Sequence, residues 1–203
     1  ELDSGARSFG EINIDYPMQW GGIRLAPSIG VQHLAYDLDD TFNNAIDNTP
    51  SITAPQAQIK FDMVFEKNTA KRHTIEPGIF YIYRDADDQN TLPLFDTDLL
   101  TINRNHLTRD SAFSGYDRLE DTHQAALYLT HRRFDTRGQE TLAATIGQIN
   151  YFQDATTATE LLSHRNNDSD SSAIITDIEA KLSSQWQSHI TALWDANDNQ
   201  LEE

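Results

Sequence analysis

The chain has 203 residues and is strongly acidic, with 32 Asp and Glu against 15 Lys and Arg and a formal net charge of -17. So much negative charge repels a phosphate backbone, which argues against nucleic acid as a partner. Cysteine is absent, which excludes disulfides, thiolate metal sites and cysteine nucleophiles within these residues. No apolar run reaches the roughly 18 residues of a transmembrane helix. The chain lacks an initiator Met and a signal peptide, so we expect a piece of a longer protein.

Apolar and polar residues alternate along most of the chain. The segments GEINIDYPM (10–18), APQAQIKFDMVFEK (54–67) and SQWQSHITALW (184–194) all show this order. A period of two is typical of a strand with one wet face and one apolar face. The pattern predicts about eight antiparallel strands joined as hairpins, at residues 8–18, 22–35, 55–66, 71–84, 122–134, 140–153, 172–183 and 185–195.

The lengths of these strands and of their connections favour a membrane barrel. Several strands exceed ten residues, whereas an ordinary globular strand has about 5–6 and a membrane-crossing strand about 9–11. Short turns alternate with long connections such as 36–53, 85–121 and 154–171, as in outer-membrane barrels, which have short periplasmic turns and longer extracellular loops. We therefore predict an all-β fold, an antiparallel transmembrane β-barrel segment. A soluble, carbohydrate-binding β-sandwich is the alternative, because it too is built from long antiparallel strands.

Aromatic residues fall mostly near the ends of the predicted strands, where barrels carry interfacial girdles. They are Trp20, Tyr36, Tyr81, Tyr83, Tyr128, Phe134, Tyr151, Phe152, Trp186 and Trp194. In a barrel, the two faces of the third predicted strand would lie in different environments. Its polar set is expected to face the lumen and comprises Gln56, Gln58, Lys60 and Asp62; its apolar set is expected to face lipid and comprises Ile59, Phe61, Met63 and Phe65.

Three linked motifs carry a family resemblance. Glu76-Pro77 opens a strand, PLFDT follows at 93–97, and FSGYDRLEDTHQ follows at 113–124; ATIGQINYF at 144–152 then fits the next strand. In this order and spacing they resemble the LPS-assembly outer-membrane protein family, LptD, also called organic solvent tolerance protein. The resemblance implies that residues 1–203 lie in the middle of that family's C-terminal barrel domain, without its periplasmic N-terminal domain, its disulfide cysteines and its terminal strands.

The resemblance also implies a function. A family member sits in the outer membrane of a Gram-negative bacterium and inserts lipopolysaccharide into the outer leaflet. It works with an LptE-type lipoprotein plug inside the barrel, and its N-terminal domain meets the periplasmic proteins that bridge lipopolysaccharide to it. No cofactor and no enzymatic activity are implied. A generic outer-membrane channel or receptor is the alternative within the barrel class.

The connection from residue 85 to 121 is the most distinctive part of the chain. A connection of nearly forty residues without regular structure is usually functional or disordered, and its fixed motifs favour an ordered loop folded over or into the lumen. Gly115 allows a positive φ in SGYD, and Asp117 and Arg118 can bind backbone groups of a loop that has little apolar surface of its own. The candidate site residues, expected to be structural or to contact plug or lumen, are Phe95, Asp96, Thr97, Phe113, Ser114, Gly115, Asp117, Arg118 and Asp121.

The sequence gives weaker support for a catalytic or metal site than for a barrel. The acidic residues Glu76, Asp96, Asp98, Asp117 and Asp121 show no spacing that singles out the carboxylate pair of a glycosidase. The seven histidines lack the spacing of metal ligands, and the serine of FSGYD lacks the flanking glycines of a nucleophile elbow. We expect no catalytic residue and no metal site.

Overall fold

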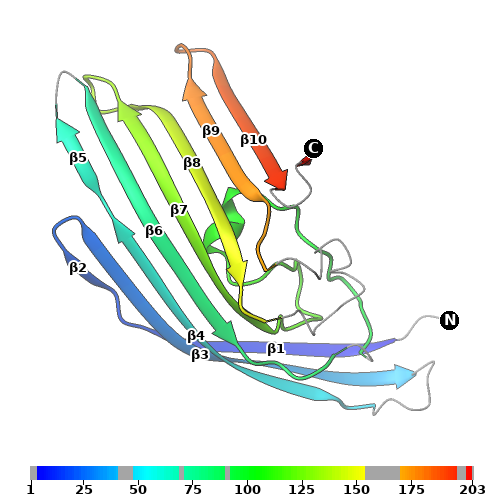
Figure 1. The fold of residues 1–203 in the computed structure, drawn as a ribbon. Helices are drawn as coiled ribbons and strands as arrows, with labels where there is room; N and C mark the ends of the chain where they lie inside the picture. Colours follow the sequence, from blue (N-terminus) through cyan, green and yellow to red (C-terminus); the bar gives the residue numbers. More distant parts are fainter. Residues whose placement is uncertain are drawn as a thin grey trace.

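The computed structural model describes residues 4–40, 48–68, 71–89, 92–153, 170–195 and 200–202, which form one curved antiparallel sheet (Figure 1). Its strand order is β1-β3-β4-β6-β7-β8-β9-β10-β11, with β2 paired to β3 and β5 paired to β6. The strands are β1 (Ser4–Asp15), β2 (Met18–Trp20), β3 (Ile23–Asp40), β4 (Ser51–Met63), β5 (Phe65–Asn68), β6 (Arg72–Arg84), β7 (Thr122–Phe134), β8 (Glu140–Tyr151), β9 (Ile174–Lys181), β10 (Gln187–Asp195) and β11 (Gln200–Glu202). One short 3₁₀ helix, η1 (Arg104–Thr108), lies in the long connection between β6 and β7.

The eight predicted strands are confirmed as β1, β3, β4 and β6 to β10. Two of the additional short strands arise where a long strand is interrupted. Pro17 has no N–H to donate, so the first strand breaks there and resumes as β2. At Val64 the second interruption separates β5 from β4, and the N–H of Val64 donates to the carbonyl of Gly22 at 2.7 Å.

The predicted long loop at 36–53 is wrong at both ends. β3 continues to Asp40, and β4 begins at Ser51. The segment from Tyr36 to Asp40 alternates apolar and acidic residues, and Tyr36 and Leu38 are buried on the concave face while Asp37 is exposed on the other. The acidic residues made the segment look like a loop, although the alternation itself continues. Residues 41–47 of that loop and residues 154–169 of the predicted 154–171 connection lie outside the described residues.

Connections of different length reach opposite ends of the sheet, as predicted. Because neighbouring strands are antiparallel, the strand ends that the long connections join (β3 to β4, β6 to β7 and β8 to β9) lie at one end of the sheet, and the turns near 21, 135–139 and 182–186 lie at the other. The 135–139 turn shows how the short ones are built. Gly138 has a φ of 78°, and the Asp135 carboxylate accepts hydrogen bonds from the N–H groups of Arg137 and Gln139 at 2.8 and 2.9 Å. These backbone bonds lower the pKa of Asp135.

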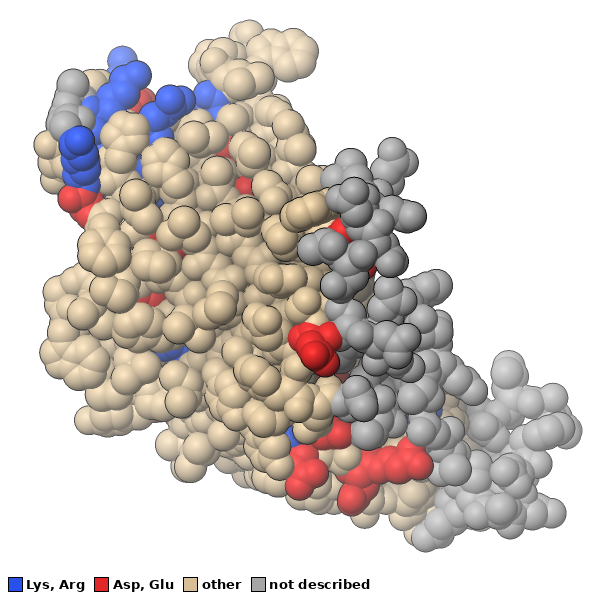
Figure 2. All heavy atoms as spheres, in the orientation of Figure 1, with Lys and Arg blue, Asp and Glu red and all other residues tan. Residues whose placement is uncertain are grey.

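The two faces of the sheet differ in polarity. The convex face exposes large apolar side chains that no second layer covers in the described part of the chain, including Ile12, Ile14, Ile29, Leu127 and Ile190. Figure 2 shows this face as a broad band of uncharged side chains, with Lys and Arg gathered at the end of the short turns and Asp and Glu at the end of the long connections. No helix among the described residues is long and apolar enough to cross a membrane.

The expected aromatic girdle is partly wrong. Tyr36 is only 3% exposed and belongs to the core, and Tyr128 lies on the concave face, where its hydroxyl donates to Asp62 at 2.6 Å. Aromatic residues on the convex face and in the turns are exposed, as a girdle requires: Trp20, Tyr83, Phe152, Trp186 and Trp194.

Candidate functional site on the concave face

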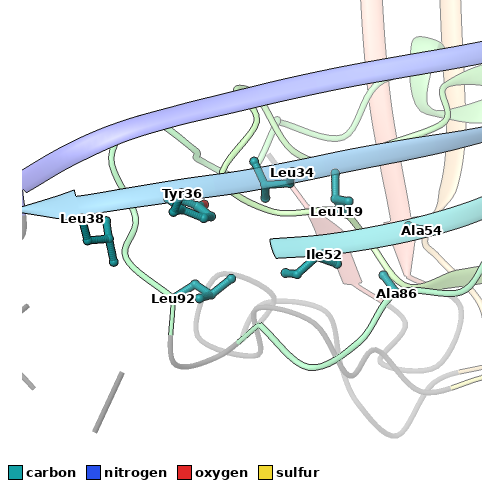
Figure 3. Packing of buried hydrophobic residues seen from close by; sticks show 8 residues of the cluster. All are labelled: Leu34, Tyr36, Leu38, Ile52, Ala54, Ala86, Leu92 and Leu119. Carbon is teal, nitrogen blue, oxygen red and sulfur yellow. The ribbon is translucent and has the colours of Figure 1, made fainter. Parts of the chain in front are cut away.

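The loop 85–121 packs against the concave face of the sheet and forms a core with it. Figure 3 shows the first cluster, in which Ala86, Leu92 and Leu119 of the loop meet side chains of β3 and β4: Leu34, Tyr36, Leu38, Ile52 and Ala54. A second cluster places Leu107 of η1 among buried side chains of β6 to β9: Phe80, Ile82, Ala126, Ile149 and Ile175. The expectation that the loop has little apolar surface of its own is therefore wrong.

Asp117 makes the contacts that hold the loop together, and its side chain is completely buried. One carboxylate oxygen, Oδ2, accepts hydrogen bonds from three consecutive N–H groups, those of Phe95, Asp96 and Thr97, at 2.9, 2.7 and 2.9 Å. The Asp117 N–H in turn donates to Oγ1 of Thr97 at 2.9 Å. The FSGYDR motif and the PLFDT motif are thus two halves of one structure, joined through this carboxylate.

The other oxygen of Asp117 binds Arg7 of β1, which also contacts Asp96 at 2.6 Å. The Arg7 guanidinium lowers the pKa of Asp96 below its ordinary value, because it stabilises the charged carboxylate. Tyr36 of β3 adds a second link between the loop and the sheet, since its hydroxyl donates to the carbonyl of Asp117 at 2.9 Å. The loop is therefore fastened to β1 and β3 by polar contacts at one residue.

Arg118 and Gly115 complete the turn. The buried guanidinium of Arg118 donates to the carbonyls of Leu92, Pro93 and Asp117 at 2.6, 3.1 and 2.9 Å, which supplies donors to backbone groups that the loop leaves without strand partners. Gly115 has a φ of 71°, and a Cβ there would lie 2.7 Å from Oδ1 of Asp96. Both the conformation and the space require glycine at this position.

The remaining predicted loop residues lie close by. Ser114 and Asp98 exchange hydrogen bonds through the Ser114 hydroxyl and N–H, and Phe113 is buried opposite Leu99. Asp121 is half-buried one residue before β7. The acidic residues considered for a glycosidase do not form a pair around an open cleft, because Asp117 is enclosed and Glu76 lies on β6, where it binds Arg132 at 3.1 Å.

A polar network beneath the loop links three strands that sequence reasoning treated separately. Gln56 donates to Glu11 and Asn13 of β1 at 3.0 and 2.7 Å, and its carbonyl accepts from the buried Arg84 of β6 at 2.8 and 3.0 Å. Arg84 continues to the carbonyl of Glu120 in the loop at 3.4 Å. Gln56 therefore lies on the concave face, as its alternation indicates, but it is buried under the loop.

Beyond the loop the concave face opens into a basin of about 910 Å³. Two of the predicted lumen residues, Lys60 and Asp62, line it together with charged side chains of neighbouring elements: Arg24, Glu66, Glu76, Arg104 and Arg132. Gln58 lies between these residues and Gln56 on the same face of β4. Ile59 and Phe65 are 44% and 55% exposed on the convex face, and Phe61 and Met63 are half-buried there.

One cluster on β9 and β10 has side chains of the types that bind metals. Asp177, Glu179 and His189 offer ligand atoms within 4.8 Å of one another. Arg104 of η1 already lies 3.5 Å from Asp177 and 3.4 Å from Glu179, and His189 contacts Asp177 at 2.7 Å. Because Arg104 forms ion pairs with both carboxylates, the cluster holds η1 to β9.

Sequence reasoning missed the partners of the loop. Arg7 lies 110 residues from Asp117, and Tyr36 is the first residue of the predicted 36–53 connection. The sequence signal for Arg7 is its place in the alternation of β1: Arg7 has the same odd-numbered spacing as Glu11 and Asn13 and so shares their concave face, opposite the apolar Ile12.

Comparisons with known proteins identify the family of the chain. The family model for LPS transport system D, LptD, matches residues 2–203. The chain belongs to the LptD family. Proteins named LPS-assembly protein LptD from Xanthomonas axonopodis pv. citri and Saccharophagus degradans are each 30% identical to it, over 97% and 96% of the chain, and one from Nitrosococcus oceani is 33% identical over 85%. The chain spans about a quarter of the length of these LptD relatives, 24 to 26%.

Proposed function

We propose that this chain is a wall segment of an outer-membrane β-barrel that transfers lipopolysaccharide to the outer leaflet; the names of its family and relatives, LPS transport system D and LPS-assembly protein LptD, support a role in LPS transport and assembly. The observation that carries the proposal is the division between its faces. The convex face exposes apolar side chains of five or more strands, whereas the concave face carries a charged basin and an ordered loop. A barrel with lipid outside and a polar lumen inside requires this division. A soluble sandwich would cover the convex face with a second sheet.

In this arrangement the concave residues face the lumen. Lys60 and Asp62, with Arg104 and Arg132 nearby and Gln58 next to them on β4, form a polar wall along which the saccharide and phosphate groups of lipopolysaccharide remain hydrated. The same wall is the contact surface for an LptE-type lipoprotein plug. Periplasmic proteins that bridge lipopolysaccharide to the barrel act through a domain outside this chain. The lipid-facing set comprises Ile59, Phe61, Met63 and Phe65.

The loop 85–121 fills the lumen side between β3 and β9 near the end of the long connections. Its position is defined by the contacts of Asp117 with β1 and β3, so we assign it the role of a fixed inner element that shapes the lumen and supports the plug. A loop held only by apolar packing would tolerate sliding. Directional bonds to Arg7 and Tyr36 define one position.

The test replaces Gly115 by Val in the full-length parent protein. The substitution places a β-branched side chain at a positive φ and against Asp96, at a cost of about 1–3 kcal/mol for the backbone conformation. We expect the barrel to insert at a normal level while cells become sensitive to bile salts and to large hydrophobic antibiotics. Gly10→Val is the matched control, because a Cβ at Gly10 meets no atom within 4 Å.

Two results would contradict the proposal. Normal resistance at normal protein level in Gly115→Val would mean that the loop has no role in the barrier. Loss of protein in proportion to resistance would make the motif a folding element only.

A further inference from the structure

A row of basic side chains crosses three strands on the convex face, at the end of the short turns. Lys67 of β5 pairs in register with His73 of β6, and His73 pairs with Arg133 of β7. His131, one row further along β7, lies beside His73 with the rings stacked 5.7 Å apart and the ring nitrogens 3.4 Å apart. Figure 2 shows basic side chains gathered over this end of the convex face.

The charge of this basic row is not balanced locally. Across the described ranges, no carboxylate forms an ion pair with Lys67, His73, His131 or Arg133; Arg133 instead donates to the hydroxyl of Thr141 at 3.3 Å. Glu66, the sequence neighbour of Lys67, pairs with Arg72 at 3.8 Å. An uncompensated basic row is unexpected in a chain with a net charge of -17, and it is complementary to an anion.

An apolar surface begins directly below the basic row. Phe65 and Ile75 line a hollow of about 420 Å³ together with Glu66, Lys67, His73 and His131. Along the same face of β6 and β7, an apolar hollow of about 510 Å³ follows. It is lined chiefly by Pro77, Ile79, Leu127, Leu129 and Ile146. A free anion would gain nothing from this apolar continuation, whereas a molecule with an anionic head and acyl chains would contact both parts.

We propose that the basic row and the apolar surface below it form a binding site for one anionic phospholipid. Its phosphate contacts Lys67, Arg133 and the histidine pair, and its acyl chains lie over Ile75, Ile79 and Leu129. The inference rests on the proposed function, which places the convex face in lipid. Short turns of outer-membrane barrels face the periplasm, so the bound lipid belongs to the periplasmic leaflet, the one opposite the long loops.

The test measures lipid retention by the full-length parent barrel, purified in detergent with its plug, by native mass spectrometry. Phosphatidylglycerol and phosphatidylcholine with identical acyl chains are titrated in separate experiments. The wild-type protein should retain phosphatidylglycerol in preference. Lys67→Gln and Arg133→Gln should each weaken phosphatidylglycerol binding by about fivefold, the effect of one basic residue near an anionic lipid surface, and leave phosphatidylcholine binding unchanged.

Arg137→Gln is the matched control, because Arg137 is an exposed cation at the same end of the sheet, in the 135–139 turn and outside the basic row. It should leave the preference intact. Equal retention of both lipids by the wild type, an equal loss in Arg137→Gln, or displacement of phosphatidylglycerol by inorganic phosphate would each overturn the inference. Failure of the proposed function gives a different result: a barrel that is monodisperse without detergent and retains neither lipid.

Discussion

Replacing Asp117 by Ala should release the loop from the wall while the strands remain paired. The substitution removes the acceptor of three backbone N–H groups and the partner of Arg7 at once. A buried donor left without an acceptor costs about 1–3 kcal/mol, and breaking a buried ion pair costs about 3–5 kcal/mol. Asp96 is exposed and the Arg7 side chain is 19% exposed, so water relieves part of the loss. We expect a local destabilisation of about 3–5 kcal/mol.

Amide hydrogen exchange on the full-length parent measures this destabilisation directly. In the wild type, the N–H groups of residues 95–97 are protected by the Asp117 carboxylate, and in Asp117→Ala they should exchange about two to four orders of magnitude faster, since each 1.4 kcal/mol is tenfold. Peptides from β6 and β7 should exchange as in the wild type. Asp98→Ala is the matched control, because among the described residues the Asp98 carboxylate accepts only the neighbouring N–H of Leu99, at 2.8 Å, and water can replace it.

The reasoning is refuted if residues 95–97 remain as protected in Asp117→Ala as in the wild type, because the carboxylate would then not hold the PLFDT segment. It is also refuted if Asp98→Ala exposes the loop equally. A loss of protection that extends through β6 and β7 would show that the loop stabilises the barrel as a whole, contrary to the separation argued above.

Two further predictions concern the same loop. Burial, together with the nearby Arg109 charge, lowers the pKa of His106, whose Nδ1 accepts the N–H of Asn103 at 3.2 Å. Just below the ordinary pKa of about 6.5, the folded loop therefore binds fewer protons than the unfolded one. The stability of the loop should fall as the pH drops from 7.5 to 5.5. Exchange of residues 103–108, corrected for the intrinsic rate, should show this loss, and His106→Asn should abolish it. Tyr36→Phe should cost only about 1 kcal/mol, because the carbonyl of Asp117 keeps its bond from Arg118; a loss as large as that of Asp117→Ala in the same exchange measurement would contradict this.

The strands were predictable because alternation is a local property that the sheet preserves. β7 begins and ends at the predicted residues, 122 and 134, and Ile12 and Glu11 of β1 face opposite sides as their order indicates. The errors fall where composition and alternation disagree. Tyr36 and Leu38 lie beside Asp37, Asp39 and Asp40, which suggest a loop, yet both are buried in β3.

The loop was predictable in its members but not in its contacts. PLFDT and FSGYDR carry the family resemblance, and the structure joins them through Asp117. The counter-charge comes from Arg7, whose sequence separation of 110 residues leaves no local pattern. The apolar residues that bury the loop, such as Leu92 and Leu119, are too widely spaced to give a period of two or of 3.6, so sequence periodicity could not reveal the core they form.

The concave face shows why alternation predicts the side that a residue faces but not its environment. Ile52, Ala54, Gln56, Lys60 and Asp62 all point to the same side of β4. The first two are in a hydrophobic core because the loop covers them, and the last two line an open charged basin because it does not. Gln56 lies at the boundary, where its amide satisfies β1 on one side and Arg84 on the other. An apolar side chain at that position would leave the buried guanidinium of Arg84 without these bonds. The loop that covers Gln56 therefore requires a polar residue at this position, whereas the alternation of the strand predicts only the side that the residue faces.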